Sequence, residues 1–272
     1  MFYKLGKVYI CELLPLNLTH GKWSMIKSSF YAVFLFLILI LASSCEQVQN
    51  ARLKKAVMER DFMKVRELVK HGADPNTKID VGSVLGHTIS SGDPETVKIL
   101  VKHGADINAY QPLPALGQAA MDGKPEIAEF LIKEGAVVKG PAVAKAPPLE
   151  LAAACGNWKT FKVIVDHGGD IFQTSSRNYN MLHSASHSAN PQIMSFLIDK
   201  GIDVNVANHK GEAPLHILLK NDSINEESIQ ILIENGANPE IEDNNGKTPR
   251  DIARENGHLD TLEKILSRHK EQ

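Results

Sequence analysis

The stretch VKHGADIN at residues 101–108 has a near copy, VKHGADPN, at residues 69–76, 32 positions earlier in the chain. In both copies a run of periodic apolar residues ends at a glycine, Gly72 or Gly104. Glycine is the residue that most readily adopts the left-handed conformation in which many helices end. Each copy is therefore predicted to end a helix, and its recurrence indicates a repeated structural unit.

The repeat extends over most of the chain. When the sequence is aligned on Leu215 of the PLH stretch, equivalent leucines recur every 31 to 33 residues, and a glycine follows each of the first five by nineteen residues. The sixth unit is two residues longer, and Arg250 takes the leucine position in a seventh unit. The aligned leucines are Leu53, Leu85, Leu116, Leu149, Leu182 and Leu215, and the terminating glycines are Gly72, Gly104, Gly135, Gly168, Gly201 and Gly236.

Each unit is predicted to contain two short helices. Thr248 and Pro249 form a good start for a first helix, because threonine caps the helix and proline suits its first position. Small residues follow, then a glycine break, and DPE at residues 93–95 begins a second helix. Helices this short are marginal alone, and one unit cannot bury its own apolar stripe. Stacked units can do so, which predicts an all-α solenoid stabilised by nearest-neighbour contacts.

Several stretches resemble the ankyrin repeat family: MLHSA at 181–185, PLHIL at 214–218, KTPRDIARENGH at 247–258, and the set GADPN, GADIN, GIDVN and GANPE. The resemblance implies an ankyrin repeat solenoid of about seven helix-turn-helix units with short finger loops between them. The first unit resembles an N-terminal capping repeat and the seventh a C-terminal one. The predicted units are about 50–79, 80–111, 112–143, 144–176, 177–209, 210–244 and 245–272.

One connection departs from the family pattern. The segment VKGPAVAKAPP at residues 138–148 contains three prolines, which lack a backbone donor and disfavour a regular hairpin. We expect an irregular, protruding loop between the third and fourth units.

The N-terminal segment is predicted to lie outside the solenoid. Residues 30–41 are twelve consecutive apolar residues, too few for a comfortable bilayer span of about 20 residues but typical of a signal-peptide core. The following ASSC resembles a bacterial lipoprotein signal, which implies cleavage before Cys45 and attachment of lipid to it. We expect Met25 to be the true start of translation. An uncleaved N-terminal membrane anchor is the alternative.

These predictions divide the chain into a signal peptide at 1–44, a tether at 45–49 and an ankyrin repeat domain at 50–272. The whole sequence has a formal net charge of −2, and the part from Cys45 onward has −5. Neither value suggests a basic nucleic-acid-binding surface. Aromatic residues amount to 6% of the chain, too few to favour a base-stacking platform.

Candidates for catalysis or metal binding are weak. His183 and His187 have a spacing of four residues that can hold a metal, but no third ligand follows. The resemblance implies instead that His183 is the family's structural histidine, which bonds the backbone of the neighbouring loop. Cys155 is expected to be a small buried side chain on a first helix. We predict no enzyme activity, no metal and no cofactor, and no small-molecule substrate.

The remaining candidate is the surface that the resemblance implies, formed by finger tips and the exposed side of the first helices along a concave groove. Tyr and Arg are enriched at binding hot spots, and Tyr110, Arg177 and Tyr179 have no core role in the repeat pattern. The candidate partner-binding residues are Tyr110, Gln111, Leu113, Met121, Asp122, Arg177, Tyr179, His187, His209, Lys210, Glu212, Asn244 and Lys247.

The sequence thus predicts a non-enzymatic protein–protein interaction module. With the N-terminal signal, it is expected to be a lipid-anchored protein of the bacterial cell envelope, facing the periplasm or the outer surface, that binds another protein. One alternative is a periplasmic immunity or inhibitor protein directed against a toxin or enzyme. An alternative of another class is a hydrolase with its site near the loop at residues 138–148.

Overall fold

The computed structural model describes residues 46–79, 82–109, 113–139, 147–175, 177–222 and 224–270. The chain forms two compact units, Met1–Ala51 and Arg52–Gln272. Of the first unit only residues 46–51 are described, and they are helical. Residues 46–49, predicted as a tether, are thus part of a helix that extends to residue 58. The apolar run at residues 30–41 and Cys45 lie outside the described residues.

The described part of the second unit consists of short helices joined by turns and loops, with a single isolated bridge between Lys78 and Ser83. After the helix that ends at residue 58, the helices are α2 (Phe62–Lys70), α3 (Val84–Ser91), α4 (Pro94–Lys102), α5 (Ala115–Met121), α6 (Pro125–Lys133), α7 (Pro148–Ala154), α8 (Trp158–Asp166), α9 (Met181–Ser188), α10 (Pro191–Asp199), α11 (Pro214–Leu219), α12 (Glu226–Glu234), α13 (Pro249–Glu255) and α14 (Leu259–Lys270).

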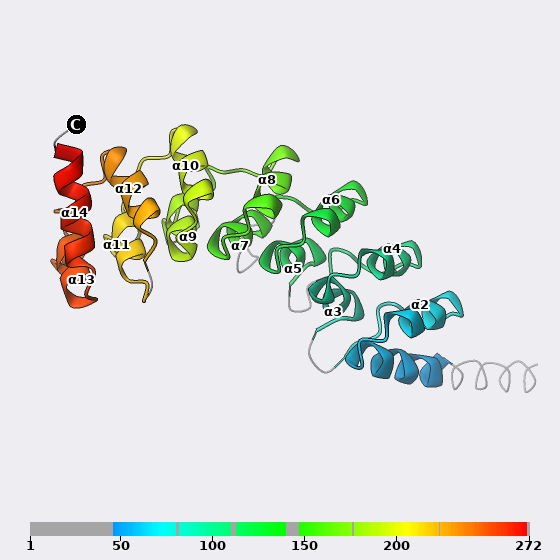
Figure 1. Cartoon of the computed structure of the whole chain (residues 1–272). Coiled ribbons are helices and arrows are strands. Elements are labelled where there is room, and N and C mark those ends of the chain that lie inside the picture. The colour runs from blue at the N-terminus through cyan, green and yellow to red at the C-terminus, as the bar shows by residue number, and fades with distance from the viewer. Residues whose placement is uncertain are drawn as a thin grey trace, which may run out of the picture. The chain divides into compact units, whose positions relative to one another are not determined.

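The helices pack as successive pairs. Each first helix contacts the next first helix, in the order α3, α5, α7, α9, α11 and α13, and each second helix contacts the next, from α2 to α14. Figure 1 shows these pairs placed one after another within Arg52–Gln272. The main contacts join neighbouring units, as the repeat pattern predicted. The predicted fold class, an all-α solenoid of stacked helix pairs, is therefore confirmed.

Caps and glycines set the helix ends where the sequence predicted them. The Asp93 side chain accepts hydrogen bonds from the amides of Glu95 and Thr96 at the start of α4. Thr248 caps α13 in the same manner. All six terminating glycines have positive φ, including 94° at Gly72 and 91° at Gly104. These are left-handed conformations in which a Cβ would be strained.

A second set of left-handed residues follows the first helices. Glycine occupies this position after α3, α5, α7 and α13, but Ala189 occupies it after α9 with φ of 49°. A non-glycine residue in this conformation is uncommon and costs backbone strain. This strained turn borders the pocket described below.

The core is one continuous cluster through the stack. All six aligned leucines are buried, and small residues such as Ala119, Ala120 and Ala152 let the first helices approach closely. Trp158 packs against the core, with its ring 6.1 Å from that of Phe161 and 5.6 Å from that of Phe196 on α10. The protruding loop predicted at 138–148 lies mostly outside the described residues, since 140–146 are not described.

Asparagine side chains bridge some neighbouring units but not others. Asn76, Asn108 and Asn205 each donate to the carbonyl of the next unit's terminating glycine, at 2.9, 3.2 and 2.8 Å. Each also accepts a backbone amide two residues beyond that glycine. At the equivalent position the third and fourth units have Lys139 and Phe172, which cannot reproduce this bridge. Hydrogen bonding between adjacent loops is therefore uneven along the stack.

Candidate partner-binding site

The fifth and sixth units bring several predicted surface residues together. Tyr179 lies in the loop before α9, His187 near the end of α9, and His209 in the following finger loop. The Tyr179 ring stacks on that of His187 with centroids 6.2 Å apart and planes 4° apart. Its centroid also lies 6.2 Å from the His209 ring. Three side chains that are distant in sequence thus form one aromatic cluster.

The loops that carry this cluster are joined by backbone hydrogen bonds. The His209 amide donates to the Arg177 carbonyl at 2.9 Å, and His209 Nδ1 lies 3.1 Å from the same oxygen. Asn178 donates through its side chain to the Ala207 carbonyl at 2.6 Å. The two finger loops are therefore held in register, so the exposed side chains of Arg177, His209 and Lys210 keep a common arrangement.

His183 supports the cluster from beneath. It is fully buried, its Nε2 lies 3.0 Å from the Glu212 carbonyl, and its Nδ1 accepts the Asn180 amide at 3.1 Å. Burial lowers the pKa of His183, so the neutral ring is favoured. His216 repeats the arrangement one unit later, with Nε2 3.2 Å from the Lys247 carbonyl. The predicted structural role of His183 is confirmed, and His216 has the same role in the next unit.

Glu212 does not lie where the sequence placed it. It was predicted to be an exposed finger-tip residue, but only 4% of its surface is exposed. Asn208 donates to its Oε2 at 2.8 Å, and Lys220 forms an ion pair with its Oε1. Burial alone would raise the pKa of Glu212, but the bonds from Asn208 and Lys220 outweigh it and the pKa is lowered. Glu212 is therefore buried beneath the site surface, where it holds Asn208 and Lys220 in place.

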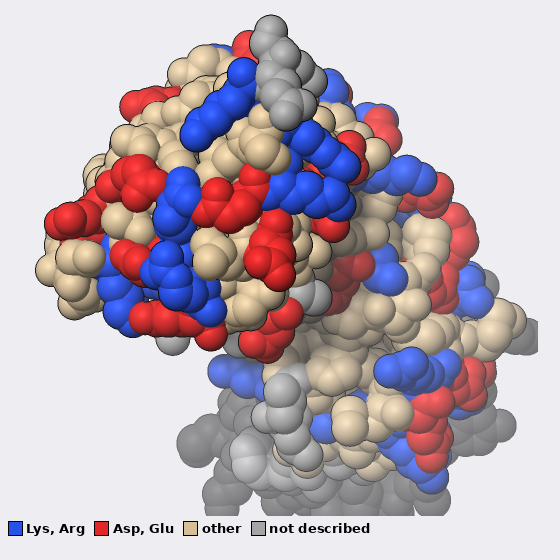
Figure 2. Space-filling model, turned by 60° about the vertical axis from the view of Figure 1, so that its left-hand side comes forward, with Lys and Arg blue, Asp and Glu red and all other residues tan. Residues whose placement is uncertain are grey.

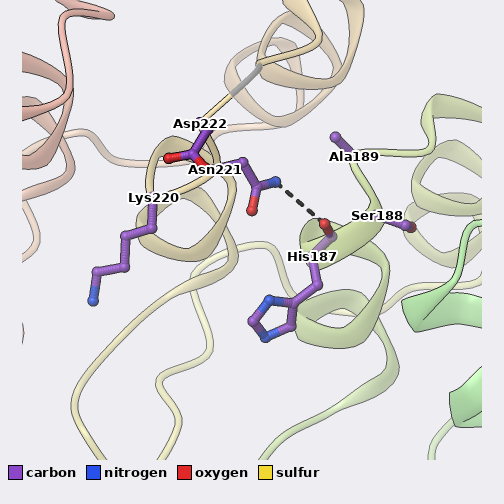
Figure 3. A pocket seen from close by; sticks show the side chains of 6 residues that line it. All are labelled: His187, Ser188, Ala189, Lys220, Asn221 and Asp222. Carbon is purple, nitrogen blue, oxygen red and sulfur yellow. Dashed lines mark hydrogen bonds between the residues drawn. The ribbon is translucent and has the colours of Figure 1, made fainter.

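An open pocket of about 400 Å³ adjoins the cluster. It lies between the ends of α9 and α11 and is lined by His187, Ser188, Ala189, Lys220, Asn221 and Asp222 (Figure 3). Asn221 donates across it to the carbonyls of Ser186 and His187, at 3.1 and 3.3 Å. The lining is polar, so the pocket suits a hydrophilic side chain of a partner better than an apolar ligand.

The other predicted site residues lie elsewhere on the stack. Met121 is 37% exposed at the end of α5, next to Asp122, which accepts from Ser90 and Gln118 at 2.6 Å each. Leu113 is half-buried. In the last finger loop Asn244 donates to the His209 carbonyl, whereas Lys247 pairs with Glu255. Tyr110 and Gln111 lie outside the described residues, so their predicted role stays a prediction.

Cys155 also departs from expectation. It was expected to be buried, but it is exposed at the end of α7. Partial desolvation and the nearby Asp122 carboxylate raise the pKa of the thiol, which lowers its thiolate fraction and its nucleophilicity. Within the described ranges, no group of three or more His, Cys, Asp or Glu side chains is placed to hold a metal ion. Among the helices of the same ranges, none has both the length and the hydropathy of a membrane span.

The stacked helix pairs and the surface of joined finger loops define a helical repeat protein of the interaction-module class. The family model for ankyrin repeats in three copies matches residues 53–140, 116–208 and 182–272. The chain therefore belongs to the ankyrin repeat family. Ankyrin repeats bind other proteins, and the fold is generally a non-enzymatic scaffold.

Similar proteins agree with this assignment. The crystal structure of the human ASB11 ankyrin repeat domain superimposes with a TM-score of 0.68 at 20% identity, covering 78% of this chain and 96% of that one. Protein phosphatase 1 regulatory subunit 27 of Mus musculus is 33% identical over 70 residues, 26% of this chain. Potassium channel AKT1 of Arabidopsis thaliana is 36% identical over 63 residues, 23% of this chain. The matches span 46% and 7% of these two relatives.

Proposed function

We propose that this ankyrin repeat protein captures a partner protein through the finger loops and first helices of its fifth and sixth units. The observation that carries the proposal is the aromatic cluster of Tyr179, His187 and His209. These rings meet from three separate segments, and their exposed edges have no role in the core. Tyrosine ranks among the residue types most enriched at binding hot spots.

Charge around the cluster indicates the chemistry of the partner. Arg177, Lys210 and Lys220 are exposed cations. Of the two carboxylates at the site, Glu212 is buried and paired with Lys220, and Asp222 of the pocket lining is exposed, so cations are in excess. An acidic side chain on the partner would meet a locally positive surface there. We therefore expect the partner to present a segment that combines acidic and aromatic groups, and its association to weaken as salt is added.

The first test is partner capture by a surface variant. Replacing Tyr110, Arg177 and Tyr179 together by Ala is expected to leave helicity and thermal unfolding close to those of the wild type. Affinity for the partner captured by the wild type should fall by tenfold or more, on the order of 1.4 kcal/mol or above. A matched control replaces Lys98, Lys133 and Lys159, exposed on second helices, by Ala. Equal binding by the surface variant and this control would exclude the proposed site.

We propose further that the protein is held at a bacterial envelope by lipid on Cys45. Support comes from the sequence alone, since the lipoprotein-like ASSC follows an apolar run of signal-peptide length. Mass analysis of the mature protein is expected to find Cys45 at the N-terminus with acyl chains attached. Cys45→Ser should leave the leader uncleaved. A wild-type protein that retains residues 30–41 would instead establish the uncleaved anchor.

The predicted alternatives are separated by the same experiments. An immunity or inhibitor protein would use the same surface, and the identity of the captured partner distinguishes it from a scaffold. The hydrolase alternative places its site near residues 138–148, of which 140–146 lie outside the described residues. It requires turnover of a substrate without any partner, whereas the proposed module requires capture without turnover.

A further inference from the structure

The first repeat differs in charge from the rest of the protein. Residues 52–70 contain seven basic and three acidic side chains, a net of +4, whereas residues 71–272 have a net charge of −8. Six of the basic residues are exposed, namely Arg52, Lys54, Lys55, Arg60, Lys64 and Lys70. Such an asymmetry between one end of a chain and the remainder indicates a separate electrostatic role for that end.

The opposite end of the stack has no such excess. Figure 2, in which the C-terminal repeats come forward, shows Lys and Arg interspersed with Asp and Glu. Arg250 pairs with both Glu240 and Glu263, and Arg254 pairs with Asp251. The first repeat also contains the pairs Lys55–Glu59 and Lys64–Glu67, but its basic side chains still outnumber its acidic ones by four, so its basic excess is not a general property of capping repeats in this chain.

Exposed apolar side chains lie among the cations of the first repeat. Met58 is 64% exposed, and Met63, on the face of α2 opposite its buried residues, is 72% exposed. Arg66 donates to the Met63 sulfur at 2.7 Å. Long apolar side chains next to Lys and Arg are the composition of surfaces that lie at a lipid headgroup layer, where sulfur and methylene groups enter and cations stay outside.

We propose that the surface formed by Arg52, Lys54, Lys55, Met58, Arg60, Met63 and Lys64 docks on a membrane that contains anionic lipid. The inference rests on the proposed anchoring and adds which face of the repeat domain meets the bilayer. It is independent of the kind of anchor. Whether Cys45 is lipidated or residues 30–41 remain inserted, Arg52 follows Cys45 by seven residues, at most about 25 Å of extended chain.

Because this connection is short, the exposed cations of the first repeat stay close enough to the membrane to be attracted by anionic headgroups. Attraction between exposed cations and anionic headgroups is screened beyond about 10 Å at 0.1 M salt. A domain on a long linker would spend most of its time beyond that range, but this connection holds the first repeat near the surface. The partner-binding site lies four units further along the stack, so docking through the first repeat leaves it accessible.

The test uses the full chain with Cys11, Cys45 and Cys155 replaced by Ser, which retains the apolar run as an anchor. Spin labels are placed at Met58→Cys or Met63→Cys, and at Arg268→Cys, exposed on α14, as a control. The measured quantity is the ratio of the label's collision rate with oxygen to its collision rate with a water-soluble nickel chelate, which rises when a label enters the lipid. We expect this ratio at residues 58 and 63 to be about twofold or more higher in vesicles that contain phosphatidylglycerol than in phosphatidylcholine vesicles. The ratio at the control site should stay constant.

Charge reversal provides the second arm. Lys54→Glu with Lys55→Glu should abolish the rise, whereas Arg268→Glu with Lys270→Glu, an equal charge change on α14, should not. Labels at 58 and 63 that stay as water-exposed as the control in anionic vesicles would overturn the proposal. If the labels at 58 and 63 are shielded from water in native membranes but not in lipid vesicles, this face binds a membrane protein and not lipid. That result would also overturn the proposal. Vesicle flotation reports anchoring separately, so loss of docking and loss of the anchor are distinguishable.

Discussion

Phe161→Ala is expected to lower the free energy of unfolding by about 3–5 kcal/mol, the largest effect of any single substitution considered for this protein. Phe161 is fully buried in α8, and its ring lies 6.1 Å from that of Trp158 and 5.9 Å from that of Phe196 on α10. Truncation leaves a cavity between two neighbouring units. Because each unit is stabilised mainly by its neighbours, damage at this interface weakens both halves of the stack.

Urea unfolding followed by circular dichroism measures the change. Phe172→Ala is a matched control, since it removes the same ring eleven positions later from a site that is 62% exposed. We expect the control to stay within about 0.5 kcal/mol of the wild type. Similar losses in the two variants would show that the packing around Phe161 does not stabilise the array as described.

His183→Ala is expected to cost about 1–3 kcal/mol, because it removes the acceptor of the part-buried Asn180 amide and one of the two donors to the buried Glu212 carbonyl, which keeps its bond from the Asn208 amide. The Glu212 carbonyl loses its bond to Nε2, and the Asn180 amide loses its bond to Nδ1. Because this bond to Glu212 is lost, the finger loop before α11 should become less ordered. Tyr179, which packs on His183, should then shift, and partner binding should weaken. His103→Ala is the control, because His103 is exposed and its Nδ1 contacts only the Ile99 carbonyl of its own helix.

His183 also predicts the direction in which the free energy of unfolding changes with pH. Burial lowers the pKa values of His183 and His216 in the folded protein, so the unfolded chain binds more protons below about pH 6.5. Their contribution to stability is complete above that pH and is lost as the pH falls below it, by up to about 1.4 kcal/mol per pH unit for each histidine. His183→Ala should show a shallower decline than the wild type. An unchanged slope would contradict a buried neutral His183.

Local signals in the sequence predicted the repeat structure well. A helix end marked by glycine and a helix start marked by DPE or TP are set by the φ preference of one or two residues, so they can be inferred without the rest of the fold. The aligned leucines were predicted to be equivalent, and all are buried. An asparagine four residues after the terminating glycine was visible in three units, at residues 76, 108 and 205, but its bridge to the next unit was not inferred.

The candidate site was predicted less well, because the repeat pattern gives a residue's position along the chain but not its neighbours across units. Tyr179, His187 and His209 were each predicted as surface residues. That their rings form one cluster depends on the register between adjacent finger loops. Glu212 was wrongly placed on the surface, since its burial is compensated only by Asn208 and Lys220. Cys155 was wrongly placed in the core. Helix α7 ends at Ala154, so Cys155 lies just beyond the helix, where it is exposed.

The sequence by itself determined the stacked helical repeat architecture, since short helices with an apolar stripe every 31 to 35 residues can bury that stripe only by stacking. It also determined the charge contrast between the first repeat and the remainder. Only the tertiary structure decided which polar groups of neighbouring loops meet, and therefore which side chains are available to a partner. Those contacts join residues about 30 positions apart, and their geometry follows from the packing of whole units, which no local preference encodes.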